Sequence, residues 1–215
     1  MKSQLEYFES IKALGEKVVT GAPMVAFASG KGGVGKSTLI TSVGVALADL
    51  GNKVLILDGD PGMADLHILL GRTPDSNWSH FLKGDCTLRE VIEPDLFGVD
   101  LIHGFSGMPN LEWASSGAMQ LVLREMARIS MDYDIVLIDV GAGVNEVSIA
   151  LTTFVQQVFL VVTSDFTSIA DAYGALKTTL KWNPEQKIQL LANRCKEEGE
   201  GKRSHESFSS VAKNS

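Results

Sequence analysis

Six short runs of consecutive apolar residues recur along the chain, and segments with helical periodicity separate most of them. Continuous rather than alternating apolarity is typical of strands that are covered on both faces, as in a mainly parallel sheet. Right-handed crossovers then place the carboxyl ends of the strands, and the loops behind them, along one edge. We therefore expect a three-layer α/β fold with strands at Met24–Ala28, Lys53–Leu57, Val99–Ile102, Ile135–Ile138, Val158–Val162 and Ile188–Ala192.

The segments between these runs carry the spacing and end signals of helices. Thr87 and Glu90 form a capping-box pattern at one of them. Ser168 and Asp171 are cap-like residues at another. Helices are predicted at Thr38–Leu50, Asp65–Leu70, Leu88–Ile92, Ala114–Ile129, Val144–Phe154 and Ser168–Lys181.

Composition divides the chain into three parts. Residues 1–20 have the spacing of an amphipathic helix, with charges of both signs, so we expect this extension to pack on the domain itself or on a protein partner rather than on a membrane. Residues 21–195 form the α/β domain. Residues 196–215 are a polar tail, expected to be helical around Ser204–Ala212 or frayed.

Charge and cysteine content argue against several classes of protein. The chain has 215 residues, a net charge of −7 and 45% apolar residues, which fits one folded domain and disfavours a broad nucleic-acid-binding face. Cys86 and Cys195 have no C-x-x-C partner, so we expect free thiols in a reducing cytoplasm. Neither a signal peptide nor a membrane-spanning run is recognisable, and membrane insertion is not expected.

A glycine-rich segment follows the first predicted strand and precedes the first predicted helix of the domain. From Gly30 to Ser37 it matches the phosphate-binding pattern G-x-x-x-x-G-K-[S/T]. Glycines at 30, 32, 33 and 35 allow positive φ angles and close backbone approach, so that successive N–H groups can surround a phosphate. Lys36 can reach β- and γ-phosphates, and the Ser37 hydroxyl can ligate Mg²⁺. The pattern predicts a P-loop NTPase fold.

Carboxylates at the ends of two other strands suit a metal ion and water. Asp58 and Asp60 end one strand, and Asp139 follows four apolar residues in another, which is the Walker B pattern. Behind it, Gly141 and Gly143 would let the loop move with the γ-phosphate.

The segment Gly-Lys-Gly-Gly-Val-Gly-Lys-Ser-Thr at 30–38 resembles the deviant Walker A motif of the MinD/ParA ATPases, with Lys31 as the additional lysine. The resemblance implies an ATP-dependent homodimer in which Lys31 contacts phosphate. It also implies that Asp60 positions the attacking water, Asp58 supports the metal, and Asp139 holds Mg²⁺ through water. Asn193 would bond adenine, next to Arg194. The implied catalytic residues are Lys31, Lys36 and Asp60, the metal residues Ser37, Asp58 and Asp139, and the nucleotide-binding residues Gly30, Lys31, Gly32, Gly33, Val34, Gly35, Lys36, Ser37, Thr38, Asn193 and Arg194.

Within that family, four segments look closest to the flagellar-number regulators called FlhG or FleN. They lie at 60–71, 101–107, 133–143 and 167–177, and the Asp171-Ala172-Tyr173 step is the most specific. The resemblance implies action with the signal-recognition-type GTPase FlhF, at a cell pole. Two features depart from the subgroup: Asp65 stands where Asn is usual, and no Asp-Gln-Ala activator motif is recognisable near Gln4. Only residues 196–215 follow, so attachment through a C-terminal membrane helix is not expected.

The sequence thus predicts a Mg²⁺-dependent ATPase that acts as a dimerising switch, regulating flagellar number or another positioning process. A ParA-type DNA-partitioning ATPase and a non-catalytic ATP-binding regulator remain as alternatives. An iron–sulfur carrier is disfavoured because Cys86 and Cys195 lack cluster-ligand spacing.

Overall fold

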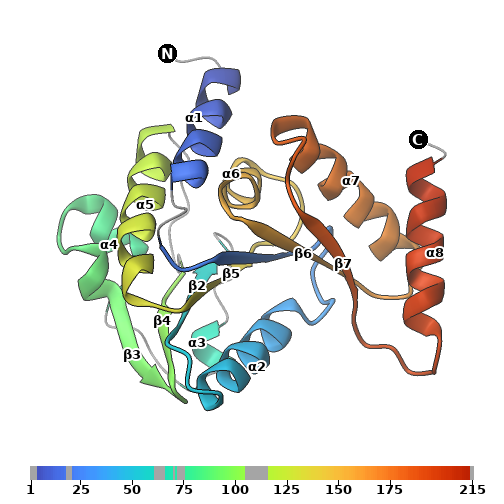
Figure 1. Cartoon of the computed structure of the whole chain (residues 1–215), viewed down its shortest axis with the longest axis horizontal. Coiled ribbons are helices and arrows are strands. Elements are labelled where there is room, and N and C mark those ends of the chain that lie inside the picture. The colour runs from blue at the N-terminus through green and yellow to red at the C-terminus, as the bar shows by residue number, and fades with distance from the viewer. Residues whose placement is uncertain are drawn as a thin grey trace.

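The computed structural model of the chain describes residues 4–17, 21–60, 66–69, 71, 76–104 and 116–213. Asp65 and much of the segments at 60–71 and 101–107 therefore lie outside the described residues. A seven-stranded sheet in the order β3-β4-β2-β5-β1-β6-β7 runs through the centre (Figure 1). Its strands are β1 (Met24–Ala28), β2 (Val54–Gly59), β3 (Ile92–Leu96), β4 (Val99–Ile102), β5 (Ile135–Val140), β6 (Gln157–Val162) and β7 (Ile188–Ala192).

All six predicted strands are present and mutually parallel, so the expectation of a mainly parallel α/β sheet is confirmed. The strand that the sequence analysis missed is β3, which pairs antiparallel with β4 at one edge. Its residues Ile-Glu-Pro-Asp-Leu include two charged residues and Pro94. That composition suits an edge strand, where one side of the backbone needs no partner.

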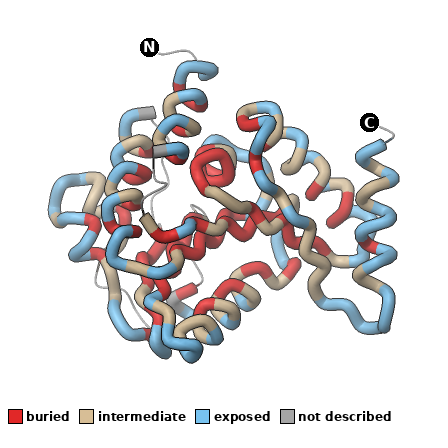
Figure 2. Tube along the Cα trace, viewed as in Figure 1, coloured by how far each residue is buried: buried red, intermediate tan, exposed pale blue. Residues whose placement is uncertain are grey.

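Helices cover both faces of the sheet, and buried residues gather along its strands (Figures 1 and 2). Successive side chains of a strand point to opposite faces. Ala26, Leu55 and Leu57 belong to the core under one layer, whereas Phe27 and Ile56 belong to the core on the opposite face. The first layer contains α1 (Gln4–Lys17), α5 (Ser116–Ile129), α6 (Glu146–Phe154) and α7 (Phe166–Trp182), and the second contains α2 (Lys36–Asp49).

Several helix limits differ from the prediction. The N-cap of α7 is Asp165, which accepts a hydrogen bond from the Ser168 backbone N–H at 2.9 Å, so Ser168 and Asp171 are not its caps. The tail forms a longer helix than expected, α8 (Glu200–Lys213), which packs beside α7 and β7. The helix α4 (Trp78–Lys83) was not predicted, and α3 (Leu66–Leu69) is a single turn.

The short 3₁₀ helix η2 (Leu88–Val91) has the predicted capping box of Thr87 and Glu90. At the amino end, α1 buries Phe8 and Ile11 against the first core. The division of the chain at residues 20 and 195 stays a prediction. Within the described part of the chain, no helix is both long and apolar enough to cross a membrane.

Candidate functional site

The glycine-rich loop connects β1 to α2 at the carboxyl edge of the sheet. Gly33 and Gly35 have φ of 78° and 86°, in the left-handed region that glycine favours. Gly35 is the N-cap of α2 and provides no side-chain cap, so first-turn N–H groups of this helix remain available to an anion. The loop opens into a pocket lined by Ser29, Lys31–Thr38, Asp60, Ile68, Leu69, Ala142 and Arg194.

The other two glycines of the motif do not have positive φ, contrary to the expectation for all four. Gly30 is required for a different reason: a Cβ there would lie 2.1 Å from the Asp171 carbonyl carbon of α7. Around Gly32, by contrast, a Cβ would meet nothing within 4 Å. The motif therefore uses Gly30 for close packing against α7, and Gly33 and Gly35 for backbone conformation.

Lys36 and Asp139 form a buried ion pair beneath the loop. Their residues are only 7% and 2% exposed, and the Lys36 Nζ contacts Asp139 Oδ1 directly. In the sheet, Asp139 on β5 is in register with Asp58 on β2. Three groups predicted for the site are thus gathered at neighbouring positions.

Asp58 is held in an environment that favours its neutral form. Burial, followed by the negative charge of Asp139, raises the pKa of Asp58 to about 7. Its oxygens accept backbone hydrogen bonds from Asp60 at 3.1 Å and Leu66 at 3.3 Å, which offset part of this rise. Asp58 therefore shapes the segment that carries Asp60 into the pocket. The predicted metal contacts of Asp58, Asp139 and Ser37 stay predictions.

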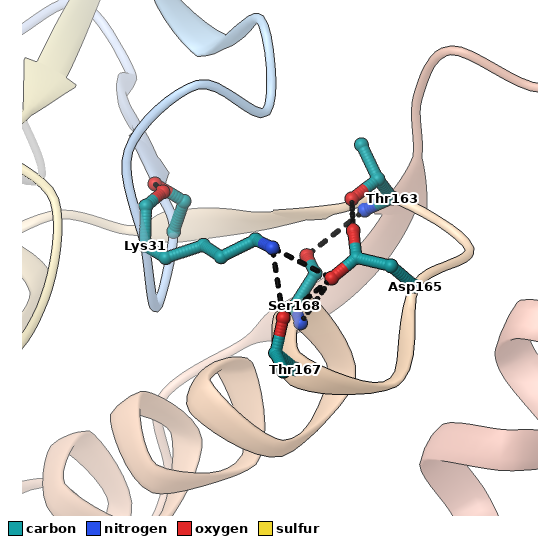
Figure 3. A network of polar contacts seen from close by, with 6 residues as sticks. Lys31, Thr163, Asp165, Thr167 and Ser168 are labelled. Carbon is teal, nitrogen blue, oxygen red and sulfur yellow. Dashed lines mark hydrogen bonds and ion pairs between the residues drawn. The ribbon is translucent and has the colours of Figure 1, made fainter.

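Lys31 joins the loop to the start of α7 (Figure 3). Its Nζ lies 2.6 Å from Asp165 Oδ1 and 2.9 Å from Thr167 Oγ1. Asp165 also accepts hydrogen bonds from Thr163, Thr167 and the Ser168 backbone N–H. Lys31 first, and then these donors, hold the pKa of Asp165 well below its usual range.

The sequence analysis did not identify Asp165 and Thr167 as site residues. An available signal was the Asp-Phe-Thr-Ser segment behind a predicted strand, which has the spacing of an N-cap. The contact with Lys31 was not recognisable, because 134 positions separate the two residues in the chain.

Asn193 follows β7 and supports the loop from the side. Its Nδ2 donates to the Val34 carbonyl oxygen at 2.8 Å, and a Cβ on Gly35 would lie 2.7 Å from that nitrogen. The next residue, Arg194, has a φ of 57° and lines the pocket. The predicted contact of Asn193 with adenine stays a prediction, while its contact with the loop is an additional finding.

The segment after β5 is also tied to the loop. The Gly143 N–H donates to the Ser29 carbonyl oxygen at 2.9 Å, and Gly143 has a φ of 82°. In turn, the Ser29 hydroxyl donates to the Lys31 carbonyl oxygen at 2.9 Å. A change at the loop can therefore reach the segments after β5 and before α7 through direct hydrogen bonds.

Cys86 and Cys195 are free thiols. Among the described residues, no group of three or more His, Cys, Asp or Glu side chains is placed to hold a metal ion by itself. Asp139 and Ser37, near the glycine-rich loop, are the residues that would suit Mg²⁺. This ion usually combines a few protein oxygens with water and phosphate oxygens.

Comparison with known proteins agrees with this geometry. Residues 25–214 match the family model described as the CobQ/CobB/MinD/ParA nucleotide binding domain. The chain is 32% identical over 179 residues to the antiactivator FleN of Pseudomonas aeruginosa, covering 83% of this chain and 64% of FleN. It is 35% identical over 192 residues to the flagellum site-determining protein YlxH of Helicobacter pylori, covering 88% of this chain and 64% of YlxH. This chain thus spans less than two thirds of the length of either relative.

Solved structures share the fold. The chain of a MinC:MinD cell division complex from Aquifex aeolicus superimposes with a TM-score of 0.70 at 26% identity, covering 89% of this chain and 78% of that one. The septum site-determining protein MinD of Pyrococcus horikoshii, crystallised with Mg-ADP, gives a TM-score of 0.71 at 24% identity, with 86% and 77% covered.

Proposed function

Because this chain belongs to the CobQ/CobB/MinD/ParA family of nucleotide-binding domains, we propose that it is a Mg²⁺-dependent ATPase whose two copies associate when ATP is bound. The observation that carries the proposal is the loop pocket, with the buried Lys36–Asp139 pair beside it. The structurally similar MinD of Pyrococcus horikoshii was crystallised with Mg-ADP, which supports a nucleotide and Mg²⁺ as the ligands.

The Lys36–Asp139 pair supplies both charges that ATP binding needs. Lys36 exchanges Asp139 for phosphate oxygens, and the loop N–H groups surround the phosphates. Asp139 then becomes available, with Ser37, to hold Mg²⁺ through oxygen and water. When bound, the metal would neutralise phosphate charge, and the exchange of partners would avoid leaving either Lys36 or Asp139 buried and unpaired.

Hydrolysis requires a water molecule placed for attack on the terminal phosphorus. Asp60 lines the pocket and is positioned by the Asp58 hydrogen bond to its N–H. We assign Asp60 the role of orienting that water, and Lys31 and Lys36 the role of stabilising charge on the transferring phosphoryl group.

Features at the rim of the pocket support association of two copies. Ile68 and Leu69 line the pocket and are exposed although they are apolar. Val144 and Phe166 are also exposed and follow the carboxyl ends of β5 and β6. Lys31 is held by Asp165 in the single chain. In the dimer, Lys31 exchanges Asp165 for phosphate, so that nucleotide binding and release of the α7 contact are coupled.

The process we propose is control of flagellar number or placement. The names of the relatives FleN and YlxH support it, and a GTPase of the FlhF type is the proposed partner. Broad nucleic-acid binding gains no support from a net charge of −7.

The decisive experiment is size-exclusion chromatography with ATP and with ADP, with phosphate release measured on the same samples. We expect dimer with ATP, monomer with ADP, and Mg²⁺-dependent release of phosphate. Binding of ATP without release of phosphate would instead identify a non-catalytic regulator.

A further inference from the structure

The turn between β3 and β4 contains a residue that backbone preference does not explain. Leu96 pairs with Val99, so Phe97 and Gly98 are the two loop residues. Both have positive φ, 55° and 83° respectively, as a type I′ turn requires. Such turns favour Asn-Gly, and a bulky side chain at positive φ is unfavourable because its Cβ crowds the backbone.

Burial does not explain Phe97 either, because this residue is 69% exposed. Leu50, at the end of α2, is 79% exposed. The β3–β4 turn lies against the last turn of α2, since a Cβ on Gly98 would lie 3.2 Å from the Ala48 Cβ. Figure 1 shows the end of α2 and the tip of β3 meeting at the bottom of the molecule. We call Leu50 and Phe97 the turn patch.

The turn patch lies at the amino edge of the parallel sheet, because its two turns precede β2 and β4. The nucleotide loop and the segments around it follow carboxyl ends of strands, at the opposite edge. The patch therefore stays accessible when the pocket is filled or when two copies meet across it. Neither ATP hydrolysis nor dimerisation accounts for these two side chains.

The charged residues closest in sequence to Leu50 and Phe97 are mainly negative. Asp49 and Asp95 are exposed, and no ion pair of either residue exists within the described ranges. The carboxyl end of α2 adds the negative end of its dipole, while Lys53 is the cation closest in sequence. Such a field repels anionic lipid headgroups and attracts basic groups. A second copy docked patch to patch would bring the same carboxylates together, and like charges across an interface are unfavourable.

We propose that the turn patch is a docking site for a partner protein, whose docked segment presents an apolar side chain next to lysine or arginine. The apolar side chain covers Phe97 and Leu50, and the cations face Asp49 and Asp95. In this proposal Phe97 stands in the turn because it binds the partner. Its role in binding explains why a residue with an unfavourable backbone conformation is found there.

The substitution Phe97→Asn separates binding from folding. Asn tolerates positive φ and restores the favoured Asn-Gly turn, so we expect an unchanged or higher melting temperature and normal ATP binding. The matched control is Leu121→Gln, which removes an exposed leucine from α5. A melting temperature clearly lower for Phe97→Asn than for Leu121→Gln would show that Phe97 serves the fold, and would overturn the proposal.

Fluorescence anisotropy with two labelled amphipathic peptides tests the chemistry of the partner. The peptides share their leucines, and one carries lysines where the other carries glutamates. The lysine peptide should bind the wild type and Leu121→Gln alike, and Phe97→Asn roughly tenfold more weakly, because loss of an anchor residue is typically worth at least that factor. Equal binding to Phe97→Asn, equal binding of both peptides, or no binding of the lysine peptide would each contradict the proposal.

Two further measurements test whether a second copy of the chain or a membrane binds the turn patch instead. Sedimentation velocity without nucleotide detects a second copy on the turn patch, and flotation with phosphatidylglycerol vesicles detects a membrane. We expect neither to depend on Phe97. Self-association or vesicle binding that Phe97→Asn abolishes would replace the partner-protein proposal.

Discussion

At the scale of single residues, the site is a set of charges that balance one another before any ligand arrives. Lys36 neutralises Asp139, and Lys31 neutralises Asp165. Burial, followed by the negative charge of Asp139, raises the pKa of Asp58. Because these residues have different electrostatic partners, we expect substitutions at them to change different properties of the protein.

Asp60→Ala should bind ATP but hydrolyse it on the order of 100-fold more slowly, because the group that orients water is lost. Dimer should accumulate, since hydrolysis is the proposed step that ends association. Phosphate release and size-exclusion chromatography would measure both effects, with the exposed Asp85→Ala as the control. Unchanged turnover in Asp60→Ala would refute the assigned role.

Asp58→Asn should change how stability depends on pH. The folded pKa of about 7 lies above the reference value of 3.8, so the stability that Asp58 contributes is complete below pH 4 and is lost as pH rises to 7. Relative to the wild type, the variant should gain stability across this window, by at most about 4 kcal/mol at ~1.4 kcal/mol per pKa unit. Urea unfolding at several pH values measures this, and a constant difference between the two proteins would contradict the raised pKa.

At the scale of elements, the loop depends on what packs against it. Gly30→Ala should destabilise the fold by about 1–3 kcal/mol, because its Cβ would collide with the backbone of α7. Gly32→Ala, which meets open space and keeps an ordinary φ, should remain within about 0.5 kcal/mol of the wild type. Thermal or urea unfolding of the two variants compares neighbouring glycines of one motif, and equal stability would argue against the Gly30 contact.

The start of α7 can be tested without removing its cap. Asp165→Asn keeps an oxygen for the Ser168 N–H but removes the charge that holds Lys31, because Asn is as good an N-cap as Asp. We expect dimerisation at a lower ATP concentration. Asp165→Ala also loses the cap, so it separates the effect of charge from that of helix stability. If Asp165→Asn dimerises only at a higher ATP concentration, Lys31 is not restrained in the monomer as proposed.

At the scale of the whole molecule, α1 belongs to the core in a way that its position at the chain end does not suggest. Phe8 is fully buried, with its ring centroid 4.4 Å from that of Trp182 on α7. Phe8→Ala should therefore cost about 3–5 kcal/mol of unfolding free energy. Leu5→Ala, at an exposed position of the same helix, should cost little. Chemical denaturation of both variants tests this, and similar small losses would mean that α1 is dispensable.

Much of this architecture was predictable from local pattern alone. The apolar runs identified six strands because buried parallel strands have no polar face, and the motif at 30–37 identified the loop because its residue types match phosphate chemistry. The strand β3 was not predicted, because an edge strand needs few apolar residues and so lacks the continuous apolar run of a buried strand. Asp165 was not predicted as the N-cap of α7, because Asp is compatible with both a turn and a helix start.

The sequence by itself determined the six parallel strands and their order along the chain, the chemical nature of the loop, and the carboxylates that stand near it, since these depend on residue types at short spacing. Only the tertiary structure decided that Lys36 pairs with Asp139, that Lys31 is held by Asp165, that Asn193 supports Val34, and that the β3–β4 turn lies against the end of α2. These contacts join segments far apart in the chain, and they form because crossover connections bring strand ends together at the edges of one sheet.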